Sequence, residues 1–484
     1  MSSTVAIVWH RRDLRVQDNP ALWQASRTGG QILAVFIVDP AIVKRDDTAP
    51  ARVYFLRESV LELQKAYRTI GGRLAVRVGE PVQQLVALAQ AVGAGAVYFN
   101  DDIEPYARER DARAAEALQA AGIQAHACCE ILLHPAGEVL TAAAGKPYTV
   151  YTPFWRQWSA KAKPKPFPTP ERLEAPVVEE QSFPDLAELG GSFPGALLVS
   201  PGEQSGLEQL EAFARDGLYR YGERRDLPGC DGTSRLSAHL KFGTVGIRAV
   251  WARTVDAWKQ AEHDRDRAGL AVWQQELGWR EFYKYELFHF PELARRPFRR
   301  EFENFQWDED QERFERWCRG ETGYPIVDAA MRQLNTVSWM HNRLRMIVAS
   351  FLTKDLLLPY GWGERYFMQK LVDGDLSANN GGWQWAASVG TDPKPLRIFN
   401  PSTQAGRYDP KAAFIRRWLP ELESVDTALL VTSERLPPLL RAQHRYAQPI
   451  VEHKGQQQLF KERYRAVRAQ QADPGEGDGA ADSE

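Results

Sequence analysis

Cysteine is scarce in this chain of 484 residues, which contains four. Cys128 and Cys129 are adjacent, whereas Cys230 and Cys318 stand alone, so the sequence has no CxxC pair. This pattern excludes a disulfide framework and a structural zinc site, and we expect no metal. The 61 Lys and Arg nearly balance the 63 Asp and Glu, which leaves a net charge of -2. A surface that is basic throughout is therefore excluded, and any contact with nucleic acid must come from a local patch.

Long apolar runs are also missing. The chain has no run of about 18 apolar residues that could span a membrane, and charged residues in the segment His10–Arg15 interrupt any signal-peptide core. We therefore expect a soluble, cytoplasmic protein with no membrane partner. No GxGxxG follows the first predicted strand and no GxxxxGK[ST] occurs anywhere, which disfavours ordinary dinucleotide binding and P-loop chemistry.

Short apolar runs alternate with helical spacing over the first 130 residues. The runs that predict strands lie at 5–9, 32–38, 74–78, 96–99 and 123–127, and helical spacing occupies about 51–69, 81–92 and 105–121. This alternation predicts a parallel, Rossmann-like sheet with helices on both faces. Its ligand should lie near the carboxyl ends of the strands.

The predicted organisation is an α/β domain joined by a long linker to an all-α domain. The α/β domain takes residues 1–130 and the linker residues 131–204, which are rich in Pro, Gly and Ser from about 161 onward. Helical patterns dominate 205–468. Residues 469–484 are small and acidic and predict a disordered tail.

Tryptophan is abundant, with eleven of the fifteen residues between positions 251 and 418. Trp273, Glu276, Arg280 and Tyr283 recur at helical spacing, and Trp279 lies beside them. A carboxylate and a guanidinium among aromatic rings suit a pocket that hydrogen-bonds a planar polar ligand. A surface helix with an Arg–Glu pair is the alternative.

A second stripe follows a predicted helix start at Tyr324–Pro325. Trp339, Asn342 and Met346 recur at i, i+3 and i+7, which predicts a shared helix face. A polar amide between Trp and Met again suggests a pocket wall.

Two further segments carry polar groups suited to ligands. Residues 232–240 place Ser and Thr hydroxyls and unpaired N–H groups at a predicted helix start, which suits a phosphate or simple N-capping. Residues 373–385 combine short acids, amides and glycines in a predicted tight loop. On a helix that begins there, Trp383 and Trp385 would point about 200° apart.

A basic patch is predicted across 392–417, and it suits phosphate contacts or a solvated charged face. Its cations are Lys394, Arg397, Arg407, Lys411, Arg416 and Arg417, against Asp392 and Asp409.

These motifs resemble the photolyase/cryptochrome flavoproteins, specifically bacterial class I cyclobutane pyrimidine dimer photolyases of the deazaflavin-antenna type. The resemblance runs from His10–Arg15 to Pro449–Val451 and is strongest at Thr322–Asp328, Trp339–Arg343 and Asp373–Trp385. It implies a monomeric carbon–carbon lyase that repairs pyrimidine dimers in damaged DNA with light. A cryptochrome-type blue-light photoreceptor is the main alternative. A photolyase for (6-4) products and a nucleotide-binding transferase fit the residues less well.

The resemblance implies a noncovalent FAD in the helical domain. Asn379 would lie beside flavin N5 and favour the reduced, anionic flavin. The other residues that would bind FAD are Tyr221, Thr233, Ser234, Arg235, Leu236, Ser237, Trp273, Arg280, Arg345, Asp373 and Asp375.

The implied reaction passes an electron from excited, reduced FAD to a dimer that has left the base stack, splits the cyclobutane ring and returns the electron. Trp279 and Trp385 would flank the dimer and Met346 would pack against it, while Glu276 and Asn342 would hydrogen-bond its base edges. The DNA contacts implied are Arg225, Glu276, Trp279, Asn342, Arg343 and Gln404, and the basic patch would hold phosphates.

The family's photoreduction chain of three tryptophans corresponds to Trp383, Tyr360 and Trp307 here. Its middle member is tyrosine, which is harder to oxidise, and Trp362 lies two residues away. We expect weaker photoreduction of the flavin or a hop through Trp362.

The first domain would hold an antenna chromophore, 8-hydroxy-5-deazaflavin (the coenzyme F420 type), with methenyltetrahydrofolate as the alternative. The candidate antenna residues are Ile37, Arg52, Asp102, Glu104 and Lys241.

Overall fold

The computed structural model describes residues 5–142, 144–179, 181–189, 191–193, 195–392 and 396–472. The chain forms two compact units. The first runs up to Ala294 and includes Arg332–Arg343 and Glu364–Asn380; the second comprises Arg295–Met331, Leu344–Gly363 and the residues from Gly381 onward. Lys394 of the predicted basic patch and residues 473–484 of the predicted tail lie outside the described residues.

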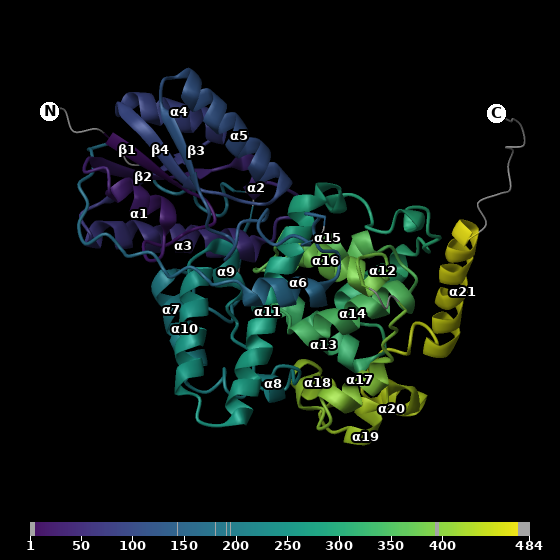
Figure 1. Ribbon diagram of the computed structural model, residues 1–484. Helices are drawn as coiled ribbons and strands as arrows, with labels where there is room; N and C mark the ends of the chain where they lie inside the picture. Colours follow the sequence, from purple (N-terminus) through teal and green to yellow (C-terminus); the bar gives the residue numbers. More distant parts are fainter. Residues whose placement is uncertain are drawn as a thin grey trace, which may run out of the picture. The chain divides into compact units, whose positions relative to one another are not determined.

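A parallel sheet of five strands lies at the centre of the α/β part of the first unit (Figure 1). Its strands are β1 (Val5–His10), β2 (Gln31–Val38), β3 (Arg73–Val78), β4 (Ala94–Asn100) and β5 (Gln124–Cys128), in the order β3-β2-β1-β4-β5. All five predicted strands are confirmed. β2 and β3 lie on one side of β1, whereas β4 and β5 lie on its other side, so the strand order switches between β1 and β4. Ligands are expected at the carboxyl ends of these two strands.

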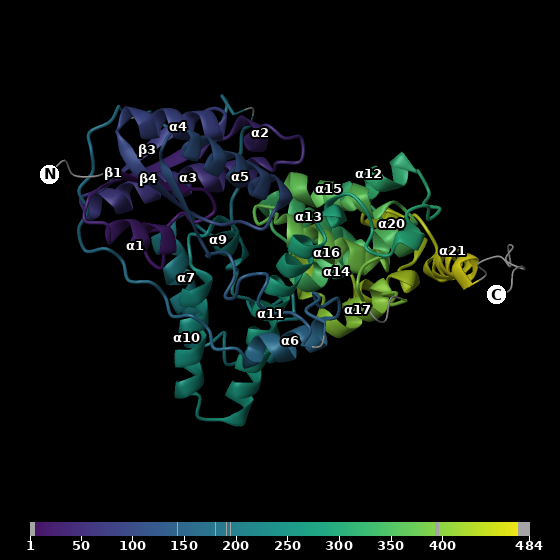
Figure 2. The ribbon, with the colours of Figure 1, turned by 45° about the horizontal axis from the view of Figure 1, so that its top comes forward.

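Helices cover both faces of the sheet, as predicted (Figures 1 and 2). Alternate residues of β1 and β2 pack on α1 (Pro20–Ser26) and α3 (Pro50–Thr69). The remaining residues of these strands pack on α4 (Pro81–Ala91) and α5 (Pro105–Ala120). Each of these four helices has proline at its first turn, where the missing N–H costs no hydrogen bond.

The rest of the first unit is helical and connects through long irregular segments. Its elements are α2 (Pro40–Val43), α6 (Tyr151–Ala160), α7 (Glu203–Arg215), α8 (Tyr221–Arg224), α9 (Ser237–Phe242), α10 (Ile247–Gln260), α11 (Asp264–His289) and η1 (Pro291–Ala294). Among the described residues between α6 and α7 there is no helix or strand. Leu173, Phe183 and Leu189 in this segment nevertheless enter the core beside α3. The domain boundaries at 130 and 204 remain predictions.

The second unit is all helical in its described part. It contains η2 (Arg300–Phe302), α12 (Gln311–Arg319), α17 (Pro401–Tyr408), α18 (Ala413–Trp418), η3 (Pro420–Leu422), α19 (Thr427–Val431), η4 (Ser433–Arg435), α20 (Pro438–Gln443) and α21 (His453–Ala472). Four helices contribute residues to both units: α13 (Pro325–Val337), α14 (Asn342–Lys354), α15 (Tyr360–Lys370) and α16 (Leu376–Ala387). Within the described ranges, no helix combines the length and the apolar character that a membrane span requires.

Candidate active site

A cluster of charged side chains lies where β1 and β4 end. Arg12 follows β1, and its guanidinium contacts Asp102 at 3.3 Å and Glu104 at 2.5 Å, both of which follow β4. The same guanidinium also binds Asp375, from the loop before α16. Lys284 of α11 completes the cluster with Nζ 3.0 Å from Asp375 Oδ2. Through the Arg12–Asp375 ion pair, the sheet edge predicted to hold a ligand thus contacts the loop Asp373–Asp375.

Asp375 has a second role at the start of α16. Its Oδ1 accepts hydrogen bonds from Ser377 Oγ at 2.5 Å and from the Ala378 N–H at 3.3 Å, so it caps the helix. Burial alone would raise the pKa of Asp375, but Lys284 and Arg12 outweigh it and hold that pKa well below its ordinary value. A permanent carboxylate therefore fixes the loop.

The hydroxyl-rich segment lies just before α9, which begins at Ser237. Ser234 Oγ accepts a hydrogen bond from the Leu236 N–H at 3.2 Å. Arg235 adopts a left-handed backbone with φ of 52°, a strained conformation for a residue with a side chain. Its Nη2 lies 2.9 Å from Asp231, whereas its Nε is buried without a hydrogen-bond partner. The segment therefore holds a residue with a strained backbone, Arg235, whose buried Nε–H has no hydrogen-bond acceptor.

Helix α11 carries the first predicted stripe. Trp273 is buried, donates from Nε1 to Thr254 Oγ1 at 3.0 Å, and packs its ring against Tyr221 with centroids 5.3 Å apart. Arg280 donates to the carbonyl of Ile131 at 3.0 Å. Of the predicted FAD residues, Tyr221 and Trp273 thus meet directly.

Glu276 and Trp279 of the same helix both have partners within the first unit. Glu276 forms an ion pair with Arg225, and burial raises the pKa of its carboxyl although Arg225 opposes that shift. The indole of Trp279 stacks on the ring of Tyr151 with centroids 3.6 Å apart and planes at 7°. Glu276, the predicted base-edge contact, therefore lies beside Arg225, a predicted DNA contact. One face of the Trp279 indole, which is predicted to flank the lesion, is already covered by the ring of Tyr151.

The second stripe is not a single helix face, so that prediction was wrong. α13 ends at Val337 and α14 begins at Asn342, which leaves Trp339 in the connection between them. Ser338 has φ of 53°, and this left-handed residue breaks the helical path. Arg343 Nη2 binds Asp226 at 2.9 Å.

The remaining predicted lesion contacts, Met346 and Trp385, belong to the second unit, as does the FAD candidate Arg345. Trp385 is half-buried and has the guanidinium of Arg397 5.9 Å from its ring centroid. Trp383, two residues earlier on α16, is buried with 2% exposure.

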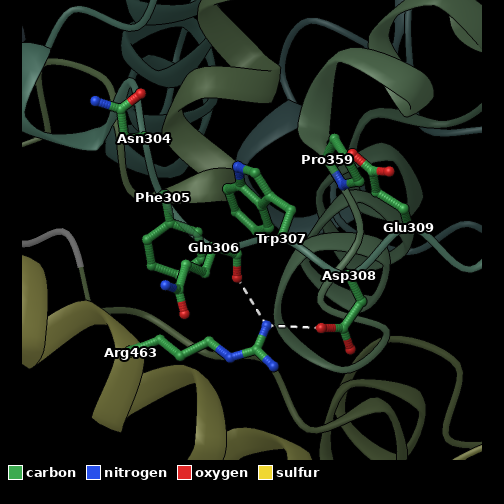
Figure 3. A pocket seen from close by; sticks show the side chains of 8 residues that line it. All are labelled: Asn304, Phe305, Gln306, Trp307, Asp308, Glu309, Pro359 and Arg463. Carbon is green, nitrogen blue, oxygen red and sulfur yellow. Dashed lines mark hydrogen bonds and ion pairs between the residues drawn. The ribbon is translucent and has the colours of Figure 1, made fainter.

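The predicted photoreduction residues lie within the second unit. Tyr360 and Trp307 pack on one aromatic cluster that includes Phe305, whose ring centroid is 4.3 Å from that of Trp307. Trp307 also lines a surface hollow of about 550 Å³ (Figure 3). Arg463 closes one side of this hollow with hydrogen bonds to the Gln306 carbonyl at 2.7 Å and to Asp308 at 2.8 Å.

Four of the five antenna candidates are charged, and two of them, Asp102 and Glu104, follow the carboxyl end of β4. Lys241 Nζ lies 3.5 Å from Glu104, which joins it to the Arg12 cluster. Arg52 donates to the carbonyls of Asp47 at 2.8 Å and Leu371 at 3.4 Å, and burial lowers its pKa to about 10. Ile37 is buried in the core between the sheet and α4 and α5.

Comparisons with known proteins agree with this arrangement. Residues 6–171 match the family model of DNA photolyase, and residues 273–466 match the FAD binding domain of DNA photolyase. A deoxyribodipyrimidine photo-lyase from Synechococcus is 46% identical over 97% of this chain and 98% of the relative. The chain belongs to the DNA photolyase family.

Other photolyases are similar over nearly the whole chain. The Escherichia coli deoxyribodipyrimidine photo-lyase is 38% identical over 93% of this chain and 96% of its own. A class III photolyase structure from Agrobacterium tumefaciens superposes with a TM-score of 0.89 at 34% identity, covering 97% of this chain and 98% of that one. The α/β and helical parts thus have the photolyase fold, while assignment to class I stays a prediction.

The residues expected around FAD fit such a cofactor. The buried Nε of Arg235 suits a phosphate oxygen, and the left-handed backbone there turns the hydroxyl-rich segment. Asn379 donates from Nδ2 to the Glu364 carbonyl at 3.0 Å, which orients its amide. The individual FAD contacts remain predictions of the photolyase resemblance.

The predicted basic patch is partly engaged in holding the fold. Arg416 donates to the carbonyls of Lys411 at 2.8 Å and Val425 at 2.9 Å, and its interpretation as a phosphate contact stays a prediction. Gln404 Oε1 is buried without a hydrogen-bond partner.

Sequence reasoning missed Tyr151 and Glu364. Tyr151 and Trp155 on α6 recur at i and i+4, an aromatic spacing that could have revealed a helix inside the predicted linker. Glu364 accepts from Asn380 Nδ2 at 3.0 Å, and burial raises the pKa of its carboxyl to about 7. A lone acid on a helix offers no sequence signal for such a shift.

Glu364 predicts a pH-dependent loss of stability. Because its pKa rises from 4.5 to about 7 on folding, the folded state holds this proton longer, and stability falls as pH rises from about 4.5 to 7. Glutamine does not titrate, so we expect Glu364→Gln to abolish this loss, which amounts to about 3 kcal/mol of unfolding free energy. The measurement is the melting temperature at pH 5 and pH 8 in both proteins. Identical pH dependence would contradict the prediction.

Proposed function

We propose that this chain repairs cyclobutane pyrimidine dimers in DNA with light. The observation that carries the proposal is the near-full-length similarity to deoxyribodipyrimidine photo-lyases, at 46% and 38% identity for two of them. The residues that would hold a flipped-out dimer, Trp279 and Glu276 on α11, lie on neighbouring positions of one helix face and are both half-buried.

FAD, when bound, would supply the light-driven electron transfer to and from the dimer. The Arg12–Asp375–Lys284 cluster would fix the loop beside the flavin, and Arg235 would bind a phosphate. Glu276 would hydrogen-bond the base edges of the extruded dimer, while Trp279 would offer an aromatic face for stacking. Tyr151, stacked behind Trp279, would keep that indole in place.

Contacts with the DNA backbone would come from guanidinium groups near this helix. Arg225 pairs with Glu276, and Arg343 pairs with Asp226. Each pair orients a guanidinium whose side chain keeps a small exposed fraction, 19% for Arg225 and 14% for Arg343. Such pre-oriented cations suit phosphate oxygens, which would hold the duplex while the dimer leaves the stack.

A blue-light photoreceptor is the second candidate. A cryptochrome from Synechocystis superposes with a TM-score of 0.86 at 27% identity, covering 96% of this chain. The deciding assay gives the protein a duplex with one thymine dimer and compares restored thymines under blue light and in the dark. Restoration in light alone supports repair; binding without restoration supports the photoreceptor.

We also propose an antenna chromophore in the first unit, 8-hydroxy-5-deazaflavin before methenyltetrahydrofolate. The charges of Arg52, Lys241 and the Arg12 cluster at the strand ends would contact it. We expect the absorption spectrum of the protein purified from its native source to show a band beyond those of FAD. A spectrum that FAD alone accounts for would contradict the antenna proposal and leave the repair proposal untouched.

A further inference from the structure

Trp383 contacts a second tryptophan that the family's electron chain does not include. The indole of Trp317 on α12 meets that of Trp383 edge to face, with ring centroids 6.2 Å apart and planes at 70°. Trp317 is fully buried and Trp383 nearly so. An oxidisable ring thus lies in direct contact with the first predicted electron donor.

The surroundings of Trp317 suit a transient positive charge. Its Nε1–H donates to the Val348 carbonyl at 3.2 Å. A backbone carbonyl stabilises a positive indole but is too weak a base to remove its proton, so Trp317 can lose an electron and keep its proton. Tyrosine gives up its phenolic proton when it is oxidised, so the same step at Tyr360 also needs a proton acceptor. The tyrosine in the middle of the expected chain therefore makes a neighbouring indole the easier donor.

An aromatic path continues from Trp317 toward a less buried indole. Phe314 stacks on Trp317 with centroids 5.9 Å apart and planes at 18°, and it also meets the ring of Trp362 with centroids 5.2 Å apart. Trp362 is half-buried, so solvent reaches it. A Cβ at Gly363 would lie 2.1 Å from Cη2 of Trp383, so the α15 backbone beside Trp362 lies against the first donor.

We propose that Trp317 is the second electron donor in photoreduction of the bound flavin and that the charge leaves through Trp362. This inference rests on the proposed function through its bound FAD. Trp383 gives one electron to the photoexcited cofactor, Trp317 gives one to the oxidised Trp383, and Trp362 gives one to the oxidised Trp317. Trp362 then loses its indole proton to water. A dissolved thiol returns one electron and one proton to it, and two thiyl radicals join as a disulfide.

The test is flash photolysis of the FAD-loaded protein with oxidised flavin and excess thiol. Transient absorption and electron paramagnetic resonance distinguish indole from phenol radicals and give the yield of the long-lived radical. We expect Trp317→Phe to lower that yield at least tenfold and Tyr360→Phe to change it less than twofold. Trp418→Phe, which removes a half-buried indole of the same unit, is the matched control. A normal yield in Trp317→Phe, or a tyrosyl radical in the unmodified protein, would overturn the proposal.

Two further measurements keep the outcome clear. If Trp317→Phe loses FAD, the same measurement is made on Trp362→Phe instead. An unchanged yield of the long-lived indole radical in that variant overturns the proposed path. Dimer repair by the unmodified protein after reduction with dithionite tests the proposed function separately. Absent repair with an intact indole signal would refute repair and leave the electron path standing.

Discussion

Asp375→Ala is expected to lose bound FAD and to lower stability by about 3–5 kcal/mol, because it leaves buried cations without their anion. Lys284, whose side chain is 2% exposed, would lose its partner at 3.0 Å, and Arg12 would lose one of three carboxylates. α16 would lose its N-cap as well. Thermal unfolding followed by circular dichroism measures stability, and flavin absorbance after gel filtration measures FAD per chain.

A double variant separates the buried charge from the cofactor. In Asp375→Ala/Lys284→Met, the uncompensated ammonium is gone, and Arg12 still has Asp102 and Glu104. We expect a partial recovery of the melting temperature without recovery of FAD. If Asp375→Ala keeps both FAD and its melting temperature, the Arg12–Asp375–Lys284 cluster does not position the loop before α16 for FAD binding.

Glu276→Ala is expected to keep FAD and to slow dimer repair about tenfold or more, since a hydrogen bond from a charged group contributes roughly 1.5–3 kcal/mol. The quantity to measure is repair per absorbed photon at saturating DNA, starting from reduced flavin. Glu276→Gln keeps a hydrogen-bonding group at this place and should recover much of the rate.

Glu223 on α8 provides the matched control for Glu276. It is also a glutamate paired with an arginine, Arg265, but both side chains are well exposed. Glu223→Ala should therefore leave repair unchanged, since an exposed pair contributes little. An unchanged repair yield in Glu276→Ala would refute the assigned role of this carboxylate.

The sheet could be predicted from the sequence because its strands are near-continuous apolar runs, such as 32–38, that lie between helices on both faces. The short helices α1 and α2 were missed because seven and four residues give too little periodicity. The stripe of Trp339, Asn342 and Met346 was misassigned because spacing alone carries no sign of the left-handed Ser338 that separates two helices.

Within the candidate site, local patterns identified single residues and their types but not their partners. The Arg12–Asp375 pair joins residues 363 positions apart, and the Tyr151–Trp279 stack joins a predicted linker to α11. Such pairs follow from the tertiary fold, which periodicity does not encode. The resemblance supplied roles for Glu276 and Trp279, whereas Tyr151, Glu364 and Trp317 became visible through contacts alone.

The long separation between Arg12 and Asp375 has a consequence for synthesis on the ribosome. At roughly 5–20 residues per second, Arg12 precedes Asp375 by about 20–70 s, and Lys284 emerges between them. During that interval the nascent α/β sheet can pair Arg12 with Asp102 and Glu104, but the ammonium of Lys284 cannot be neutralised by Asp375. The ribosome must therefore translate Asp375 before this charge cluster can close. Truncated chains that stop earlier should be substrates for chaperones and proteases.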